Sequence, residues 1–293
     1  MLDFHPIELS DREWIDPLLR LSDFNTGEYT FVNNYIWRMV YHFECARFQD
    51  FCILKTDAYG LSFVYPAGSG DLDALVAELR AYCEAAGQPL ILQCVPERLL
   101  PELESRYPGQ FDTVTNRDDY DYLYNTEDLI TLKGKKYHSK RNFINRFTEG
   151  DWKFEPITPN NIAECAAMNK EWCLQNGCAD NEGMLHEQDA VMQSLKHFFE
   201  LRLQGALLRL DGRVVAFTIG EPLNSNTYII HIEKAFNDVA GAYPTINREF
   251  AEYAAKDYAF INREEDTGDE GLRKAKLSYQ PVDLLKKYTV KFR

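Results

Sequence analysis

The sequence predicts an α/β (α+β) protein of two tandem domains, each with a mixed, mainly antiparallel sheet flanked by helices. The chain has 293 residues, and because a domain usually contains about 100–200 residues, two are expected. Its apolar fraction of 45% suffices for two packed cores. Both halves show the same order, helices before three strand-like runs and then alternating helices and strands, which indicates a duplicated architecture.

In the first half, helices are predicted where apolar residues recur at helical spacing, and strands where short runs are rich in β-branched and aromatic residues. Gly87, followed by Pro89, ends the longest of these helices. The expected elements are helices over 11–21 and 30–38, strands over 40–48, 51–56 and 61–65, a helix over 71–86, a strand over 90–94 and a helix over 96–106.

The second half shows the same order, and Asp211-Gly212 between two apolar runs is a strong hairpin signal. The basic segment 132–150 lies between the halves, so we expect domains over 1–150 and 151–293. The expected elements are helices over 162–175 and 187–203, strands over 206–210, 213–220 and 227–233, a helix from Pro244, a strand over 258–262, a helix over 270–279 and a strand over 288–292.

Charge is distributed unevenly along the chain. The net charge of −14 disfavours general coating of nucleic acid. Residues 133–146 nevertheless hold six Lys or Arg and no acid, and residues 272–293 hold seven Lys or Arg and one acid. Two basic segments in an acidic protein predict local attraction of anions. A solvated basic face is the structural alternative.

Cysteine usage and hydropathy indicate the compartment. The seven cysteines include no CxxC pair, so no disulfide framework is predicted and a reducing compartment is expected. The spacing of Cys173, Cys178 and His186 does not suit zinc, and no metal site is predicted. No apolar run approaches the roughly 20 residues that span a bilayer, and no signal peptide is evident at the N-terminus. We therefore expect a cytoplasmic protein without a transmembrane segment.

Three stretches of the chain resemble a known family. They run from Lys135 to Phe147, from His231 to Phe250 and from Asn262 to Pro281. Together they are similar to the bacterial family of the phosphatidylglycerol lysyltransferase C-terminal domain. The resemblance implies two tandem acetyltransferase (GNAT)-like domains, related to Fem-type aminoacyltransferases. It also implies transfer of an aminoacyl group from a charged tRNA to an amine or hydroxyl.

The loop before the helix at Pro244 resembles the pyrophosphate loop of acetyltransferases. Backbone N–H groups of Gly241, Ala242 and Tyr243, at a helix N-terminus, are expected to cradle an anion or acyl group. Asp238 stands where those enzymes usually carry a cation or amide, and a carboxylate facing a diphosphate is repulsive. A conventional coenzyme A site is therefore disfavoured, and an ordinary turn is the alternative.

By analogy with acetyltransferases, the end of the third meander strand is where the acyl carbonyl lies. Glu233 could take a proton from an attacking amine, and strand alternation places it on the face of His231. A salt bridge to Lys234 or Arg263 is the structural alternative. Glu264 and Glu265 follow a predicted strand and are expected to hold an amine. A cluster favoured by a helix dipole is the alternative there.

Cations in the basic segments complete the predicted site. Arg273 and Lys276 share one face of a predicted helix, where they could bind phosphate. An inter-domain helix with a solvated side is the alternative. The candidate catalytic residues are Glu233, Glu264 and Glu265, and the candidate substrate- or anion-binding residues are Lys136, Lys140, Arg141, Lys234, Gly241, Ala242, Tyr243, Arg263, Arg273 and Lys276.

These features predict an acyl- or aminoacyl-transferase that acts on the amine or hydroxyl of a small-molecule or phosphorylated acceptor. The expected donor is an aminoacyl-tRNA, which makes tRNA a partner, or an acyl-coenzyme A. A coenzyme A-dependent N-acetyltransferase and a non-catalytic binding module on the same scaffold stay open as alternatives. The oligomeric state is also left open.

Overall fold

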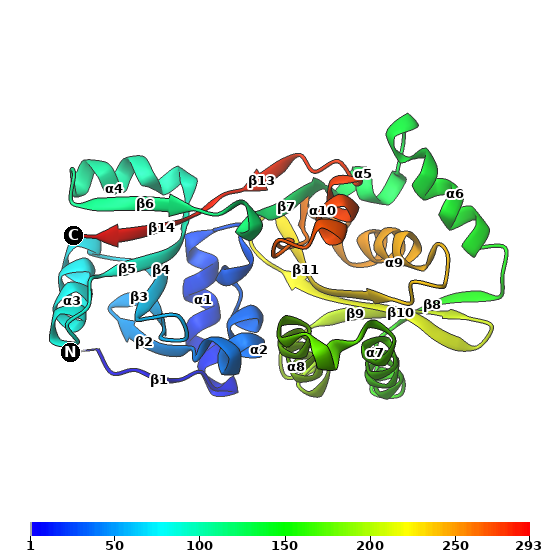
Figure 1. The fold of residues 1–293 in the computed structure, drawn as a ribbon, viewed down its shortest axis with the longest axis horizontal. Coiled ribbons are helices and arrows are strands. Elements are labelled where there is room, and N and C mark those ends of the chain that lie inside the picture. Colours follow the sequence, from blue (N-terminus) through cyan, green and yellow to red (C-terminus); the bar gives the residue numbers. More distant parts are fainter. Residues whose placement is uncertain (1) are drawn as a thin grey trace. The chain divides into compact units, whose positions relative to one another are not determined.

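The computed structural model describes residues 2–293, and the chain divides into two compact units (Figure 1). The first unit comprises Met1–Asp121, Glu265–Arg273 and Leu284–Arg293, and the second comprises Tyr122–Glu264 and Lys274–Asp283. The division thus falls at Asp121 instead of the expected Gly150. The reason is that the segment before Gly150 packs on the second unit, where two of its helices contact helix α9.

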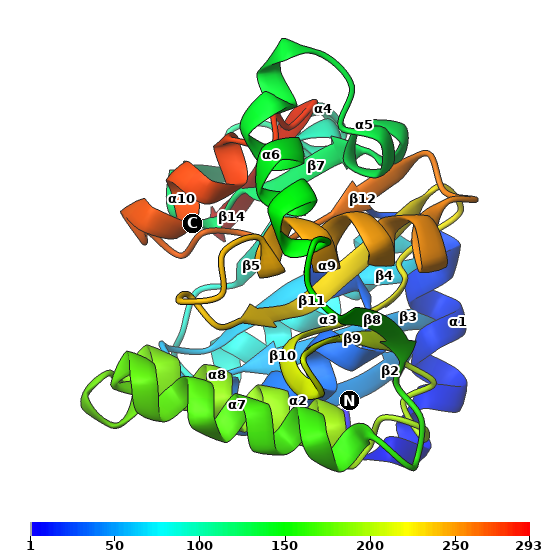
Figure 2. The ribbon, with the colours of Figure 1, turned by 90° about the vertical axis from the view of Figure 1, so that its right-hand side faces the viewer.

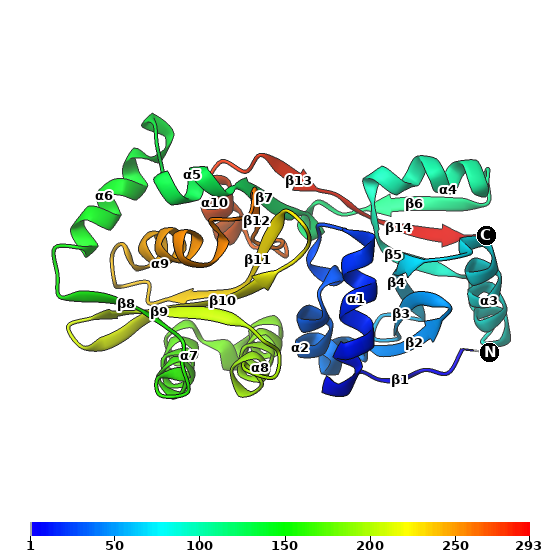
Figure 3. The same ribbon diagram turned by 180° about the vertical axis from the view of Figure 1, so that it is seen from behind.

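The elements of the first unit follow the predicted order closely. Its helices are α1 (Arg12–Ser22), α2 (Phe31–Tyr41), α3 (Leu72–Ala85) and α4 (Leu100–Arg106). Its strands are β1 (His5–Pro6), β2 (Glu44–Phe48), β3 (Asp50–Thr56), β4 (Ser62–Ser69), β5 (Ile91–Pro96), β6 (Phe111–Thr115) and β14 (Lys287–Phe292). Helix α1 packs across β3 and β4 (Figure 3).

The first sheet has the order β1-β2-β3-β4-β5-β14-β6. Its antiparallel meander β2–β3–β4 is the one predicted for the first half. Strands β4 and β5 pair in parallel, at Phe63 with Leu92 and at Val64 with Gln93. The C-terminal strand β14 lies between β5 and β6, where the ring of Phe292 packs on other aromatic rings. The last strand of the second half therefore completes the sheet of the first unit.

The second unit contains the basic segment and the second predicted meander. Its helices are α5 (Thr126–Thr131), α6 (His138–Phe147), α7 (Ile162–Asn176), α8 (Glu182–Lys196) and α9 (Ala242–Phe250), and α10 (Glu270–Leu277) continues into it from the first unit. Its strands are β7 (Asp121–Asn125), β8 (Trp152–Pro156), β9 (Gln204–Leu210), β10 (Arg213–Pro222), β11 (Thr227–Ala235) and β12 (Phe260–Asn262). The short strand β13 (Asp283–Leu285) joins the same sheet, although its last two residues belong to the first unit.

The second sheet has the order β13-β7-β12-β11-β10-β9-β8. The predicted meander is β9–β10–β11, and β11 pairs in parallel with β12. Helices α7 and α8 lie on one face of this sheet, and α9 lies on the other (Figure 2). Both sheets are mixed and mainly antiparallel, as predicted.

The turn between α7 and α8 contains a disulfide that the sequence analysis did not expect. Cys173 and Cys178 are bonded, with their Cα atoms 5.1 Å apart. Gly177 ends α7 in the left-handed conformation, which turns the chain back and brings the two cysteines within the usual range for a disulfide. A single bond that closes a five-residue separation is a local staple and no framework. Within residues 2–293, no helix combines the length and hydropathy needed to cross a bilayer.

Candidate functional site

The candidate site of the second unit begins where two parallel strands stop pairing. Strands β11 and β12 pair as far as Ile229 and Asn262. Just beyond, β11 contains a bulge, because Ile219 of β10 pairs with Ile232 while Gly220 pairs with Ile230. The residue left over in β11 is His231. Bulges bend a strand and re-aim its side chains, and they are frequent next to functional sites.

His231 bridges two carboxylates at this junction. Its Nδ1 lies 2.7 Å from Glu264 Oε1, and its Nε2 lies 3.2 Å from Glu221 Oε1. Burial lowers the pKa of His231, but hydrogen bonds to Glu221 and Glu264 outweigh it and raise the pKa to about 9. His231 is therefore an imidazolium at neutral pH, and it holds the predicted catalytic residue Glu264 in place. The backbone N–H of Glu264 also donates to Asn262 Oδ1 at 2.6 Å.

Glu233 lies two residues further along β11, between two donors. Its Oε1 is 2.7 Å from Arg263 Nη2, and its Oε2 is 3.0 Å from Asn247 Nδ2. The guanidinium lies over the rings of Tyr279 and Tyr124, with Cζ 4.8 and 5.6 Å from their centroids. The ion pair with Arg263 is the structural alternative stated for Glu233, and it fixes the orientation of the carboxylate.

Two buried polar atoms beside Glu233 have no hydrogen-bond partner. They are Arg263 Nη1, a donor, and Asn247 Oδ1, an acceptor. Buried polar atoms are bonded in most proteins, so each such exception needs an explanation. Both belong to side chains that hold the same carboxylate. The junction thus contains one unpartnered donor and one unpartnered acceptor, each on a side chain that is bonded to Glu233.

Helix α6 adds a third predicted residue to this group. Lys140 Nζ lies 3.9 Å from the centroid of the Tyr279 ring. Burial and, less strongly, the charge of Arg263 lower the pKa of Lys140 to about 8, against the opposing charge of Glu233. The fold therefore brings Lys140, Glu233 and Arg263 together from three separate elements. We call these three residues and Asn247 the Glu233 cluster.

Two further predicted cations are engaged in the interior of the second unit. Lys234 is buried, pairs with Glu187 at 2.7 Å and lies over the ring of Trp172. Lys276 donates to the carbonyl oxygens of Arg263 and Glu264, at 2.6 and 3.2 Å. Their contacts hold the site's backbone and neighbouring helices, so both have a structural role.

The remaining cations of the basic segment bind their own surroundings. Lys136 pairs with Asp128 at 3.4 Å and is half exposed. Arg141 donates to the carbonyl oxygens of Leu132 and Gly134. These bonds fix the connection between α5 and α6, and they leave Lys136 as the more accessible charge.

Gly241 has a packing role that its sequence motif did not reveal. Its φ is 91°, and a Cβ there would lie 2.3 Å from the carbonyl oxygen of Phe143. Glycine therefore allows α6 to approach the start of α9, which is formed by Ala242 and Tyr243. In an acetyltransferase loop this helix start would face the diphosphate, and here the backbone of α6 packs against it.

Two predicted residues belong to the first unit. Glu265 Oε2 lies 3.4 Å from Lys287 Nζ. The guanidinium of Arg273 pairs with Asp266 at 2.7 Å and with Asp118 at 2.6 Å. Asp266 is fully buried, so Arg273 neutralises an interior carboxylate. This pairing explains the position of Arg273 without an external anion.

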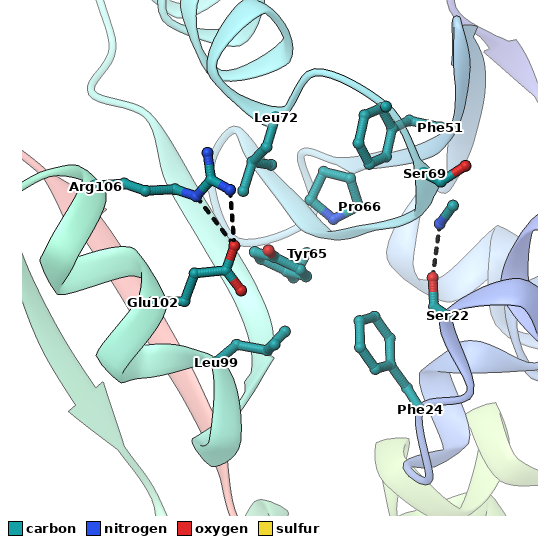
Figure 4. Close-up of a pocket in the computed structure, with 12 residues that line it drawn as sticks. Ser22, Phe24, Phe51, Tyr65, Pro66, Ser69, Leu72, Leu99, Glu102 and Arg106 are labelled. Carbon is teal, nitrogen blue, oxygen red and sulfur yellow. Dashed lines mark hydrogen bonds and ion pairs between the residues drawn. The ribbon is translucent and has the colours of Figure 1, made fainter.

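The first unit also has a junction of parallel strands, between β4 and β5. The hydroxyl of Tyr29 donates to the carbonyl oxygens of Tyr65 and Cys94, both at 3.2 Å, and so ties the two strands together. Next to it lies a pocket of about 300 Å³ (Figure 4). Its lining residues are Ser22, Phe24, Phe51, Tyr65, Pro66, Gly68, Ser69, Gly70, Leu72, Leu99, Glu102 and Arg106. The wall combines aromatic rings, leucines and a proline with glycines and polar side chains, and Arg106 pairs with Glu102.

Sequence reasoning missed Asn247 and Glu221 and gave His231 no role of its own. Asn247 carried a signal, because it is a polar residue inside the apolar stripe of α9 and is fully buried. No signal in the sequence indicated the bridge of His231, since Glu221 and Glu264 lie 10 and 33 positions away from it along the chain.

Comparison with known proteins places the chain in a family. The model of the family described as "Phosphatidylglycerol lysyltransferase, C-terminal" matches residues 19–291, so the chain belongs to this family. A conserved protein of unknown function from Bacteroides thetaiotaomicron is 40% identical, with a TM-score of 0.96 over 100% of both chains. An uncharacterised protein of Mycoplasmoides gallisepticum is 28% identical over 182 residues, which cover 61% of this chain and 58% of that relative's length.

Two more distant structures share the fold. The C-terminal domain of a putative lysylphosphatidylglycerol synthetase from Agrobacterium fabrum is 15% identical, with a TM-score of 0.66 over 96% of this chain and 91% of that one. FemX is 8% identical, with a TM-score of 0.66 over 99% of this chain and 97% of that one. These likenesses confirm the predicted fold of two tandem acetyltransferase-like units.

Proposed function

We propose that this member of the phosphatidylglycerol lysyltransferase C-terminal family is an aminoacyltransferase whose reaction centre is the Glu233 cluster. The observation that carries the proposal is the pair of buried, unpartnered atoms, Arg263 Nη1 and Asn247 Oδ1. Arg263 Nη1 can donate to a carbonyl oxygen of a ligand, and Asn247 Oδ1 can accept from a neighbouring N–H of the same ligand. An aminoacyl group offers both, on adjacent carbons. Buried polar groups without partners are costly, and such a ligand would satisfy both.

The chemistry follows from the charges of the cluster. The acceptor's amine or hydroxyl attacks the carbonyl carbon of the aminoacyl ester, and its proton passes to the Glu233 carboxylate. Arg263 Nη1 faces the oxygen on which negative charge develops, in a site largely shielded from water. The ester oxygen then leaves with the proton that Glu233 received. Asn247 Oδ1 holds the amino group of the transferred residue throughout.

The proposed donor is an aminoacyl-tRNA, and the proposed acceptor is a small or phosphorylated molecule with an amine or hydroxyl. Support for an ester donor comes from the start of α9. There, the carbonyl oxygen of Phe143 in α6 approaches Gly241, and the exposed Asp238 lies in the preceding loop. Both features disfavour the diphosphate of coenzyme A, which the rival acetyltransferase function requires.

The test compares Asn247→Ala with the matched control Asn237→Ala, an exposed asparagine in the loop before α9. Labelled lysyl-tRNA and alanyl-tRNA are offered with ethanolamine, which carries both an amine and a hydroxyl. We expect enzyme-dependent transfer of label to ethanolamine, lowered about 10²-fold by Asn247→Ala and unchanged by Asn237→Ala. Equal rates in the two variants would refute the assigned centre. Binding of the tRNA without any transfer by the unaltered protein would favour the binding module.

A further inference from the structure

The ring of Tyr279 contacts the two cations of the Glu233 cluster, and the cluster contains a single carboxylate, that of Glu233. Lys140 Nζ is 3.9 Å from the ring centroid, and Arg263 Cζ is 4.8 Å from it. Glu233 pairs with Arg263 at 2.7 Å. Within residues 2–293, Lys140 takes part in no ion pair. The cluster therefore has one positive charge in excess when Lys140 is protonated.

Other lysines of the second unit show how unusual this arrangement is. Lys136 also lies over a ring, that of Tyr137, but it pairs with Asp128. Lys234 lies over Trp172 and pairs with Glu187. In both cases a carboxylate completes the contact of the ammonium with the ring. Lys140 differs from both, because no carboxylate within residues 2–293 pairs with it.

We infer that Lys140 and Arg263 form a subsite for a singly charged oxyanion group, a carboxylate or a phosphate diester, carried by the substrate next to the reacting carbonyl. The inference rests on the proposed function and narrows its substrate class. Arg263 Nη1 has no partner and carries two N–H groups, so one can bind the reacting carbonyl oxygen and the other the oxyanion, to which a guanidinium makes directed bonds. Lys140 adds a mobile point charge from α6. The anion would bring the net charge of the cluster to zero.

Proton binding is coupled to this subsite. The groups that face Lys140 are Arg263, which directly follows β12, Glu233 of β11 and the ring of Tyr279, and on α6 itself Arg141 follows directly. Burial and Arg263 hold the pKa of Lys140 at about 8. An anion in the subsite favours the ammonium and so raises this pKa. Only protonated Lys140 attracts the anion, and affinity should therefore fall as the pH rises through 8.

The experiment uses the full chain with its lysines methylated with carbon-13, a change that keeps their charge. The Lys140 signal is assigned by its loss in Lys140→Arg and titrated by NMR in chloride, in acetate and in inorganic phosphate. We expect a pKa near 8 in chloride and a clear upward shift in acetate, in phosphate or in both. A shift in acetate alone identifies a carboxylate, and a shift in phosphate alone identifies a phosphate diester. An ordinary lysine pKa in chloride, or no shift with either anion, would overturn the inference.

Variants give a second readout that does not depend on catalysis. The anion that raises the pKa of Lys140 should bind the Lys140→Gln variant about 10-fold more weakly than the unaltered protein. It should bind Lys140→Arg with an affinity that no longer changes between pH 7 and 9, because arginine stays charged. The matched control Lys170→Gln, at an exposed lysine of α7, should bind it normally. Anion binding without aminoacyl transfer would sink only the proposed function, and transfer without anion binding would sink only this inference.

Discussion

The two units contain the same junction, a pair of parallel strands that separate after a few residues, and they close it with different chemistry. In the first unit, the Tyr29 hydroxyl bonds the carbonyl oxygens of both strands, beside a pocket of mixed polar and apolar lining. In the second unit, the ion pair of Glu233 and Arg263 lies at the junction, with two buried atoms unpartnered. A hydroxyl that bonds both backbones stabilises the fold, whereas an unpartnered donor and acceptor can form hydrogen bonds with a ligand. The comparison teaches that duplicated topology need not mean duplicated function.

The largest effect that we expect tests the charged junction. Glu233→Gln removes the proton acceptor and leaves the buried Arg263 without its carboxylate. Aminoacyl transfer should fall by about 10²–10⁴-fold, measured as initial rates with labelled aminoacyl-tRNA. Circular dichroism checks that the variant is folded, since breaking a buried ion pair also costs stability. If a folded variant retains the transfer activity, a group other than Glu233 accepts the proton of the attacking amine or hydroxyl.

A second prediction concerns pH and the bridge at His231. Its pKa is raised to about 9 by Glu221 and Glu264, so the bridge contributes stability that is fully present below the unfolded pKa of about 6.5. That contribution is lost as the pH rises through 9. It amounts to at most about 3 kcal/mol. Urea unfolding of the unaltered protein and of His231→Gln should therefore differ most at pH 6 and least at pH 10. A difference that is constant with pH would contradict the charged bridge.

The Tyr29 junction of the first unit should respond in stability alone. Tyr29→Phe removes the hydroxyl and with it both hydrogen bonds to the carbonyl oxygens of Tyr65 and Cys94. We expect a loss of about 1–3 kcal/mol in the free energy of unfolding, measured with urea, and an unchanged rate of aminoacyl transfer. If transfer falls as steeply as in Glu233→Gln, the contrast between the two junctions is false.

A smaller effect is expected for the exposed charge of the basic segment. Binding of charged tRNA should weaken with rising salt, because cations on the protein displace counterions from phosphates. Lys136→Ala should reduce the slope of that dependence by about one unit and change stability little, since exposed ion pairs contribute about 0–1 kcal/mol. Filter binding at several salt concentrations measures the slope. An unchanged slope would remove Lys136 from the predicted anion-binding residues.

The smallest effect concerns coenzyme A, for which we expect little or no binding. The packing of Phe143 against Gly241 and the charge of Asp238 both oppose a diphosphate at the start of α9. Calorimetry with acetyl-coenzyme A should show no micromolar affinity, which corresponds to about −8 kcal/mol. Micromolar binding would restore the acetyltransferase function that the sequence left open.

The sequence by itself determined the local elements and the family. Hydrophobic periodicity and turn residues predicted both meanders, because spacing along the chain is a local property. The residues of the three family stretches predicted the family that residues 19–291 match. Glu233, Arg263 and Lys140 were also selected in advance, since charged residues at strand ends and in a basic segment are visible without a fold.

Only the tertiary structure decided how these parts combine. It placed β14 in the first sheet and β7 in the second, because strand pairing depends on edges that sequence order does not reveal. It joined Arg273 to Asp266 and Lys276 to backbone carbonyls, which gave structural roles to two cations expected to bind anions. It also brought Asn247 to Glu233 and Lys140 to Tyr279. Burial, unpartnered atoms and shifted pKa values depend on neighbours distant in sequence, and so they exist only once the chain has folded.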